Sequence, residues 1–214
     1  PIVHVWHEDK GFRKSEILNK AILKTNSDYL LFTDGDCIPR KDFVSIHLKN
    51  KEVNYFLSGG YFKLPMDVSK AITDNDVETQ NCFNVSWLKK QGLNLNFKAT
   101  KLTHNRCFAS FMNWLTPTKR TFNGHNTSCF KKDILAVNGF NEDMQYGGLD
   151  REVGERMFNN DLFSKQIRYS AICIHLDHSR GYYSQEGWNK NLAIRAFNKK
   201  NGVVKIKNGI EKLP

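Results

Sequence analysis

The stretch that most constrains the fold is a short apolar run that stops at two carboxylates. Residues 29–32 are continuous and rich in large apolar side chains, and Asp34-Gly35-Asp36 follows almost directly. A short continuous run of this kind is typical of a strand buried on both faces. The carboxylates would then stand at its carboxyl end, where open α/β sheets place their ligands. Two acidic side chains one residue apart suit a hard divalent cation and the sugar phosphate that it carries.

The segments before this run predict a parallel unit. Residues 2–6 are apolar enough for a strand, and residues 13–25 carry apolar side chains at helical spacing. Strand, helix and strand over about thirty residues form a βαβ unit, normally right-handed. Because the chain opens on a predicted strand, we expect an N-terminally incomplete domain.

The remaining chain predicts further alternation, which makes an α/β class. Helices are predicted over 39–50, 67–92 in pieces, 131–137, 149–159 and 188–199; strands over 55–62 (interrupted by Gly59-Gly60), 127–130, 166–169 and 171–176; and irregular structure over 94–117. We expect one domain over 1–200 and a basic tail over 201–214.

Composition limits the classes of protein. The 214 residues are 40% hydrophobic and 25% charged, which suits a folded domain rather than a disordered chain. No apolar run approaches the roughly 20 residues of a membrane span. The five cysteines are scattered without a C-x-x-C pair, which favours a reducing compartment and disfavours a zinc-cysteine site.

The net charge of +10 leaves two interpretations open. One is a solvated, lysine-rich surface. The other is an anionic partner, such as nucleotide phosphates or an anionic membrane leaflet. Nucleic acid is not an expected partner, because the chain has no recognisable nucleic-acid-binding motif.

The chain contains its own control for the paired carboxylates. Asp74-Asn75-Asp76 repeats the pattern of Asp34-Gly35-Asp36, but it follows a polar helical stretch instead of a buried strand. We therefore interpret the second triplet as solvated surface. The strand context, and not the triplet itself, carries the prediction of a cation site.

A second cluster joins glycines to an acidic helix start. Tyr146, Gly147 and Gly148 precede Asp150. A carboxylate in a first helical turn is favoured by the helix dipole, so plain capping is one interpretation. The other is a general base that a flexible loop presents to a cleft.

Two further clusters are polar segments next to predicted strands. The strand 171–176 runs into His175 and His178, which could be metal ligands or hydrogen-bonded structural histidines. Residues 122–128 are small and polar around Gly124, which suits a sugar site or a simple turn.

Aromatic and basic residues also gather near the end of the chain. They suit a membrane-surface segment or a packed terminal helix with a solvated face. They are Tyr182, Tyr183, Trp188, Arg195, Lys199, Lys200, Lys205 and Lys207.

The order of these clusters resembles a known family. Asp-x-Asp after a strand is followed by Asn-Gly-x-Asn at 123–126, Gly-Phe-Asn-Glu-Asp at 139–143, Gly-Gly-x-Asp at 147–150 and a strand that ends in histidine. The chain, over about residues 3–180, resembles family 2 glycosyltransferases of the GT-A fold that have a β-1,4-galactosyltransferase-like C-terminal region.

The resemblance implies a Rossmann-like α/β fold with a mixed, mostly parallel sheet and flanking helices. It implies a metal-dependent inverting hexosyltransferase that moves a sugar from a nucleotide-diphosphate donor to a glycan or lipid-linked acceptor, with Mn²⁺ or Mg²⁺. Polysaccharide synthesis at the cytoplasmic face of a membrane would fit such an enzyme. The implied roles are catalytic base for Asp150; metal ligands for Asp36, His178 and His175; donor contacts for Asp34, Arg13 and Lys14; and acceptor contacts for Gly148, Asn126, Trp114 and Tyr146.

The chain departs from the family pattern at one acceptor-binding position. The family has Glu before the catalytic Asp, and this chain has Leu149, with Glu152 as the nearest carboxylate that could compensate. The alternatives are a non-catalytic nucleotide-sugar-binding domain of the same fold and, less in keeping with the motif order, a metal phosphohydrolase.

Overall fold

The structure is a computed structural model, and it describes residues 2–179 and 181–213. The elements are α1 (Lys14–Lys24), β1 (Tyr29–Phe32), β2 (Cys37–Pro39), α2 (Phe43–Asn50), β3 (Tyr55–Ser58), β4 (Gly60–Lys63), α3 (Met66–Lys70), α4 (Asp74–Glu78), η1 (Asn81–Phe83), α5 (Val85–Lys90), η2 (Phe97–Leu102), α6 (Arg106–Leu115), β5 (Thr127–Phe130), α7 (Lys131–Ala136), α8 (Leu149–Asn159), β6 (Phe163–Gln166), β7 (Ile172–His175) and α9 (Gln185–Lys200).

The strands form two mixed sheets, which confirms the predicted α/β class. One sheet has the order β1-β5-β3-β6 and the other β2-β7-β4. The pairs β3·β6 and β4·β7 are parallel, whereas β1·β5, β3·β5 and β2·β7 are antiparallel, so antiparallel pairing is more extensive than expected. The chain passes from the first sheet to the second after β1, β3 and β6, and the first of these crossings is Asp34-Gly35-Asp36.

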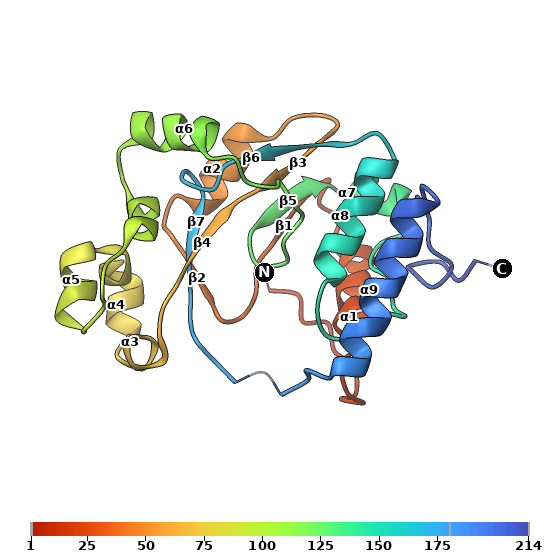
Figure 1. The fold of residues 1–214 in the computed structure, drawn as a ribbon, viewed down its shortest axis with the longest axis horizontal. Coiled ribbons are helices and arrows are strands. Elements are labelled where there is room, and N and C mark those ends of the chain that lie inside the picture. The colour runs from red at the N-terminus through yellow and green to blue at the C-terminus, as the bar shows by residue number, and fades with distance from the viewer. Residues whose placement is uncertain (1, 180, 214) are drawn as a thin grey trace.

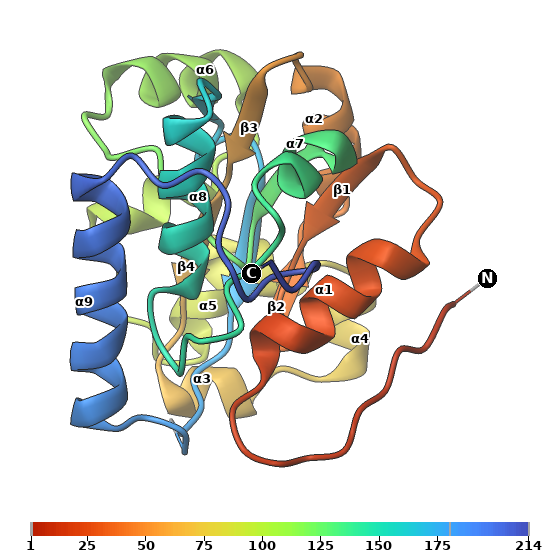
Figure 2. The ribbon, with the colours of Figure 1, turned by 90° about the vertical axis from the view of Figure 1, so that its right-hand side faces the viewer.

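Helices cover the strands on two sides. In Figure 1, α1, α7, α8 and α9 lie to the right of the strands, and α3, α4 and α5 lie to the left. Figure 2 shows α8 and α9 side by side, in agreement with their close contact. None of the described helices is both long enough and apolar enough to cross a lipid bilayer.

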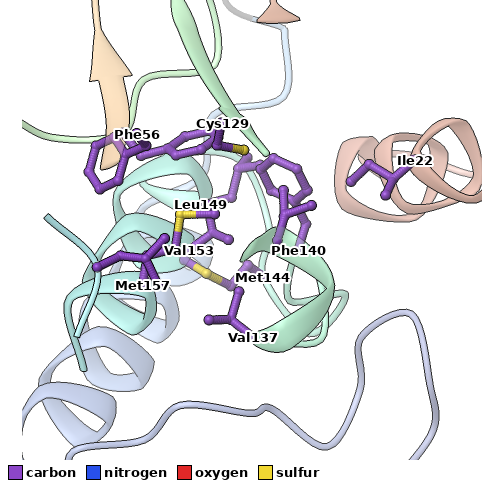
Figure 3. Close-up of a cluster of buried hydrophobic side chains, with 12 residues drawn as sticks. Ile22, Phe56, Cys129, Val137, Phe140, Met144, Leu149, Val153 and Met157 are labelled. Carbon is purple, nitrogen blue, oxygen red and sulfur yellow. The ribbon is translucent and has the colours of Figure 1, made fainter. Parts of the chain in front are cut away.

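The larger hydrophobic core fixes α8 against the first sheet. Leu149, Val153 and Met157 recur every four residues and turn one face of α8 inward, where they are at most 4% exposed (Figure 3). They pack with Phe56 of β3 and with Phe140. Fully burying side chains of this size contributes roughly 1.5–3 kcal/mol each, so the first turn of α8 is held firmly.

Gly59 separates β3 from β4, which begins at Gly60, and no larger residue fits at either position. A Cβ at Gly59 would overlap the Asn126 side chain, and one at Gly60 would overlap the carbonyl oxygen of Arg168. The close backbone approach that the glycine pair predicts is therefore present.

Residues 201–213 pack against the domain. The Asn138 side chain donates to the carbonyl oxygens of Ile206 (2.8 Å) and Glu211 (2.9 Å) and accepts from the backbone N–H of Glu211 (2.8 Å). Ile206 is 6% exposed. This basic segment is thus held against the domain next to the end of α7.

Three predicted elements differ from the structure. Residues 2–6 form no strand, because no described segment pairs with them, and Ile2 is 99% exposed. Residues 94–117 are largely helical, as η2 and α6, instead of irregular. The strand predicted at 166–169 lies three residues earlier as β6, where it pairs with β3.

Candidate active site

The register of two short strands builds the centre of the site. Antiparallel pairing sets Cys37 of β2 opposite His175 of β7, so the start of β2 lies beside the end of β7. Asp36 therefore faces both predicted histidines. Its Oδ2 is 3.0 Å from Nε2 of His178 and 3.7 Å from Nε2 of His175.

A lysine from α1 completes the acidic side of the site. Nζ of Lys14 lies 2.6 Å from Oδ1 of Asp34. Burial acts to lower the pKa of Lys14, but the surrounding carboxylates of Asp150, Asp34 and Asp36 together raise it above its usual value. Lys14 is therefore a fixed positive charge among three carboxylates.

Asp150 stands in the first turn of α8, which is anchored by the core. Its Oδ1 is buried and has no hydrogen-bond partner among residues 2–179 and 181–213. A Cβ at Gly124 would lie 2.6 Å from this oxygen, so glycine is needed for the loop to approach the carboxylate. Burial raises the pKa of Asp150, the Lys14 ammonium opposes this, and the Asp34 carboxylate adds to it. A buried carboxylate with an unused oxygen and a raised pKa has the properties of a general base.

These side chains line one cavity of about 740 Å³. It brings together the start of α1, the crossing from β1 to β2, the end of β7 and the loop that leads into α8. Its lining is Phe12, Lys14, Asp34, Gly35, Asp36, Tyr146, Gly147, Gly148, Leu149, Asp150, Arg151, His175, His178 and Trp188.

The chemistry of the donor set fits a divalent cation. Ligand atoms of Asp36, Cys37 and His175 lie within 4.8 Å of one another. A hydrogen bond with Cys173 and burial raise the pKa of the Cys37 thiol far above its usual value, so it is a poor ligand. A carboxylate with two imidazoles, from Asp36, His175 and His178, remains, and this oxygen and nitrogen set suits Mn²⁺.

A second cavity of about 540 Å³ is also lined by Asp150. Gly148, Asp150 and Arg151 line both cavities. The second cavity also contains His125, whose Nε2 is buried without a hydrogen-bond partner in the described chain. Burial lowers the pKa of His125 to about 4, so its ring is neutral near pH 7.

The structure brings most of the predicted site residues into the first cavity. Lys14, Asp34, Asp36, Tyr146, Gly148, Asp150, His175 and His178 all line it. Tyr146 is held there by the edge of Phe12, with ring centroids 5.5 Å apart.

Three predicted site residues lie elsewhere. Arg13 points to Glu16 and to the carbonyl oxygen of Glu8, and it does not line the cavity. Asn126 is fully buried, and its side chain hydrogen-bonds His47 and two backbone carbonyls, so the prediction of an acceptor contact is wrong. Trp114 is 79% exposed on α6 and lines neither cavity, so its acceptor contact stays a prediction.

Two other predictions about carboxylates are also corrected. Glu152 does not replace a missing acceptor ligand, because it is fully buried and paired with Arg156 at 2.7 Å. Asp76 is not solvated surface: it is 8% exposed and forms a capping box with Thr73 at the start of α4. Asp74 is exposed, as expected.

The terminal aromatic and basic residues divide between the site and the surface. The Trp188 ring packs against Gly147, and Arg195 pairs with Glu155 at 2.6 Å. Both residues therefore build the walls of the two cavities. Tyr182 and Tyr183 remain exposed.

Most residues of the second cavity lie outside the motifs of the sequence. Lys101 and Arg168 belong to no motif, and only the structure brings them together. His125 lies in the small polar segment 122–128, which predicts a sugar site. The side chain of this segment that lines the cavity is His125 and not the predicted Asn126.

Comparisons with known proteins yield a distant structural likeness. No protein-family model matches the chain, and no curated protein matches it. Among solved structures, the chain is similar to the mannosyltransferase PcManGT from Pyrobaculum calidifontis, solved in complex with GDP-Man and Mn²⁺, with 17% identity and a TM-score of 0.46. The match covers 87% of this chain and 41% of that one. A similarity at this level transfers no activity and no residue role.

Proposed function

We propose that this chain is a metal-dependent glycosyltransferase domain that moves a sugar from a nucleotide-diphosphate sugar to an acceptor hydroxyl with inversion. The observation that carries the proposal is the first cavity. It gathers a candidate carboxylate–imidazole cation site, a half-buried lysine and a carboxylate whose Oδ1 has no hydrogen-bond partner among the described residues, from segments far apart in the chain. Transfer between phosphorylated sugars and hydroxyls needs these groups: charge for a leaving diphosphate and a base for the acceptor.

Asp36, His175 and His178 are the residues that would hold the cation. Bound there, Mn²⁺ or Mg²⁺ would supply positive charge to the leaving diphosphate. Lys14 adds a second positive charge on the same side, and Asp34 fixes its position at 2.6 Å. Asp34 and Lys14 are thus the donor-side residues of the proposal.

Asp150 acts as the base of the proposed reaction. Its carboxylate takes the proton of the acceptor hydroxyl while that oxygen bonds to the anomeric carbon. The bond from this carbon to the diphosphate oxygen breaks, and the diphosphate leaves with the electron pair. One direct displacement inverts the anomeric centre, and no second carboxylate is required for the leaving group.

The order of motifs supports the same proposal. The Asp-x-Asp crossing, the glycine-rich entry to α8 and the histidine end of β7 are the segments on which the resemblance to family 2 glycosyltransferases rests, and they meet at one cavity. Residues 1–200 are the proposed catalytic domain. We propose that the acceptor is a glycan or a lipid-linked molecule and that transfer takes place at the cytoplasmic side of a membrane.

The experiment is a screen of UDP-, GDP- and other nucleotide sugars for binding and hydrolysis with Mn²⁺, with Mg²⁺ and with EDTA. We expect at least one nucleotide sugar to bind only with the metal and to be hydrolysed slowly. Metal-dependent binding without hydrolysis or transfer would favour the non-catalytic alternative. No metal-dependent binding of any nucleotide sugar would reject both.

A further inference from the structure

The second cavity carries a large excess of positive charge. Five basic side chains line it, against the two carboxylates of Asp150 and Glu155. The basic residues are Lys101, Lys119, Arg151, Arg168 and Arg195. The first cavity has the opposite balance, with three carboxylates against Lys14 and Arg151. Asp150 therefore stands between a cation-attracting and an anion-attracting cavity.

Most of this positive charge is not neutralised by the protein. Arg195 is paired with Glu155 at 2.6 Å. Across residues 2–179 and 181–213, no salt bridge forms to any other basic residue of this cavity. Like charges gathered without counter-ions lower the stability of the fold unless a ligand uses them.

Lys101 and Arg168 are half-buried basic residues of this cavity. Nζ of Lys101 lies 5.6 Å from the ring centroid of Tyr61, and Nε of Arg168 is buried without a hydrogen-bond partner in the described residues. Burial is the main cause that lowers the pKa of both groups, and Arg168 also lowers the pKa of Lys101. An anion placed between them would relieve this repulsion and satisfy the buried donor.

The position of Asp150 connects this cavity to the chemistry. Its carboxylate lines both cavities, so a molecule in the second cavity can present a hydroxyl to the same base that faces the first. His125 lines the same cavity, and its Nε2, which has no partner in the part of the chain that the structure describes, can hydrogen-bond a sugar hydroxyl.

We propose that the second cavity binds the acceptor and that this acceptor is anionic, a sugar that carries a carboxylate or phosphate group. Lys101 and Arg168 hold the anionic group, with Lys119 and Arg151 at the mouth, and a free hydroxyl reaches Asp150. This inference rests on the proposed function, because it names the substrate class of the same site.

The first test measures anion binding without any transfer. The full chain is titrated in low-salt buffer with EDTA, so that the metal site cannot retain phosphate, and ¹⁵N chemical shifts report binding. The probes are inorganic phosphate and a matched pair, methyl glucuronide and methyl glucoside, which differ at the carboxylate. We expect phosphate and the glucuronide to bind, and the glucoside to bind about tenfold more weakly or worse.

Variants then locate the binding. The double variant Lys101→Gln, Arg168→Gln is expected to lose about tenfold or more in affinity for phosphate and the glucuronide. The double variant Lys89→Gln, Lys90→Gln removes two charges at exposed residues of α5 that do not line the cavity, and it serves as the matched control. If the double variant of the cavity melts at a much lower temperature, Lys119→Gln, Arg151→Gln, in which both residues are exposed, takes its place.

Two results would overturn the inference at this stage. One is equal affinity for the glucuronide and the glucoside. The other is unchanged phosphate affinity in the folded double variants of the cavity. Neither result bears on metal-dependent binding of nucleotide sugars, which tests the proposed function separately.

The second test assigns the anion to the acceptor or to the donor. Transfer from the nucleotide sugar found in the screen is measured with carboxylated and uncharged acceptors. In Lys101→Gln, Arg168→Gln we expect the KM of the carboxylated acceptor to rise about tenfold or more. A rise confined to the KM of the donor would show that the cavity serves an anionic donor sugar, and the inference would be wrong.

Discussion

Asp34 and Asp36 face different partners although one residue separates them. Asp34 accepts a hydrogen bond from Lys14, whereas Asp36 faces His175 and His178. The chain leaves one sheet and enters the other at this point, so the two carboxylates point to different neighbours. Asp34 is already neutralised by the protein, and Asp36 is the carboxylate that remains for a cation.

The first prediction concerns this difference. Asp36→Asn is expected to weaken Mn²⁺ binding by at least about tenfold, because it removes the only carboxylate of the proposed ligand set. Titration calorimetry with Mn²⁺ measures the effect. Asp74→Asn is the matched control, since Asp74 occupies the same pattern on an exposed helix start. Equal losses in both variants would show that Asp36 is not a specific ligand.

The second prediction concerns Asp150. Asp150→Asn is expected to retain metal-dependent nucleotide-sugar binding and to lower transfer by about 10²–10⁴-fold, the usual contribution of a general base. Binding and initial rates are measured on the same preparation. Near-normal turnover would remove Asp150 from the reaction.

At the scale of elements, α8 joins the site to the rest of the protein. Leu149 begins this helix and is 4% exposed, so its side chain anchors the helix in the core. Glu152 lies one turn later in a buried network. It pairs with Arg156, and its Oε1 accepts a hydrogen bond of 2.7 Å from Nδ2 of Asn198 on α9. Arg156 also donates to the carbonyl oxygens of Val137 and Gly139, which ties α8 to the end of α7.

The third prediction tests this network. Glu152→Ala leaves Arg156 as an unpaired, fully buried charge and is expected to lower the free energy of unfolding by about 3–5 kcal/mol. Urea unfolding followed by circular dichroism measures it. Glu52→Ala, which breaks the exposed pair with Lys165, is the control and should cost about 1 kcal/mol or less. Similar losses in both variants would contradict a special role for the buried pair.

The elements that could be predicted are those whose own residues determine them. The periodic core face of α8 and the short apolar runs of β1 and β7 are strong local signals for a helix and for buried strands. Residues 2–6 could not be predicted in this way, because an extended segment becomes a strand only when another strand pairs with it. The α6 segment was missed because its aromatic residues partly face solvent: Phe111 is 52% exposed.

At the scale of the whole molecule, a buried histidine connects both sheets. His47 on α2 is 1% exposed, and its ring bonds Ser128 of β5 (2.7 Å) and Asn126 (2.8 Å). Asn126 in turn donates to the carbonyl oxygens of Gly60 in β4 and Ala171 before β7. Burial lowers the pKa of His47 from 6.5 to about 4.

The fourth prediction follows from this pKa. Between pH 6.5 and about 4, the unfolded chain binds a proton at His47 that the folded chain does not, so acidification favours unfolding. The stabilising contribution of the neutral ring is complete above pH 6.5 and is lost as the pH falls. We expect the difference in unfolding free energy between the wild type and His47→Gln to shrink by up to about 3 kcal/mol over this range. Urea unfolding at stepped pH measures it, and a constant difference would contradict the assignment.

The two cavities differ in how far the sequence predicted them. The first was foreseen in outline because its residues stand at strand and helix ends, where α/β folds gather ligands. The second was not, because Lys101 follows no periodic pattern and Arg168 comes just after β6. Only the packing of three distant segments brings these charges together, and local patterns carry no information about it.

The shared wall of Gly148, Asp150 and Arg151 has a consequence for inhibitor design. A metal-chelating fragment and an anionic fragment, each weak alone, could be joined by a short linker across Asp150. The second fragment would then bind at an effective concentration set by the linker, commonly in the millimolar range. The affinity of such a bivalent compound rises with this effective concentration. The gain is largest when the linker length matches the distance between the two fragments.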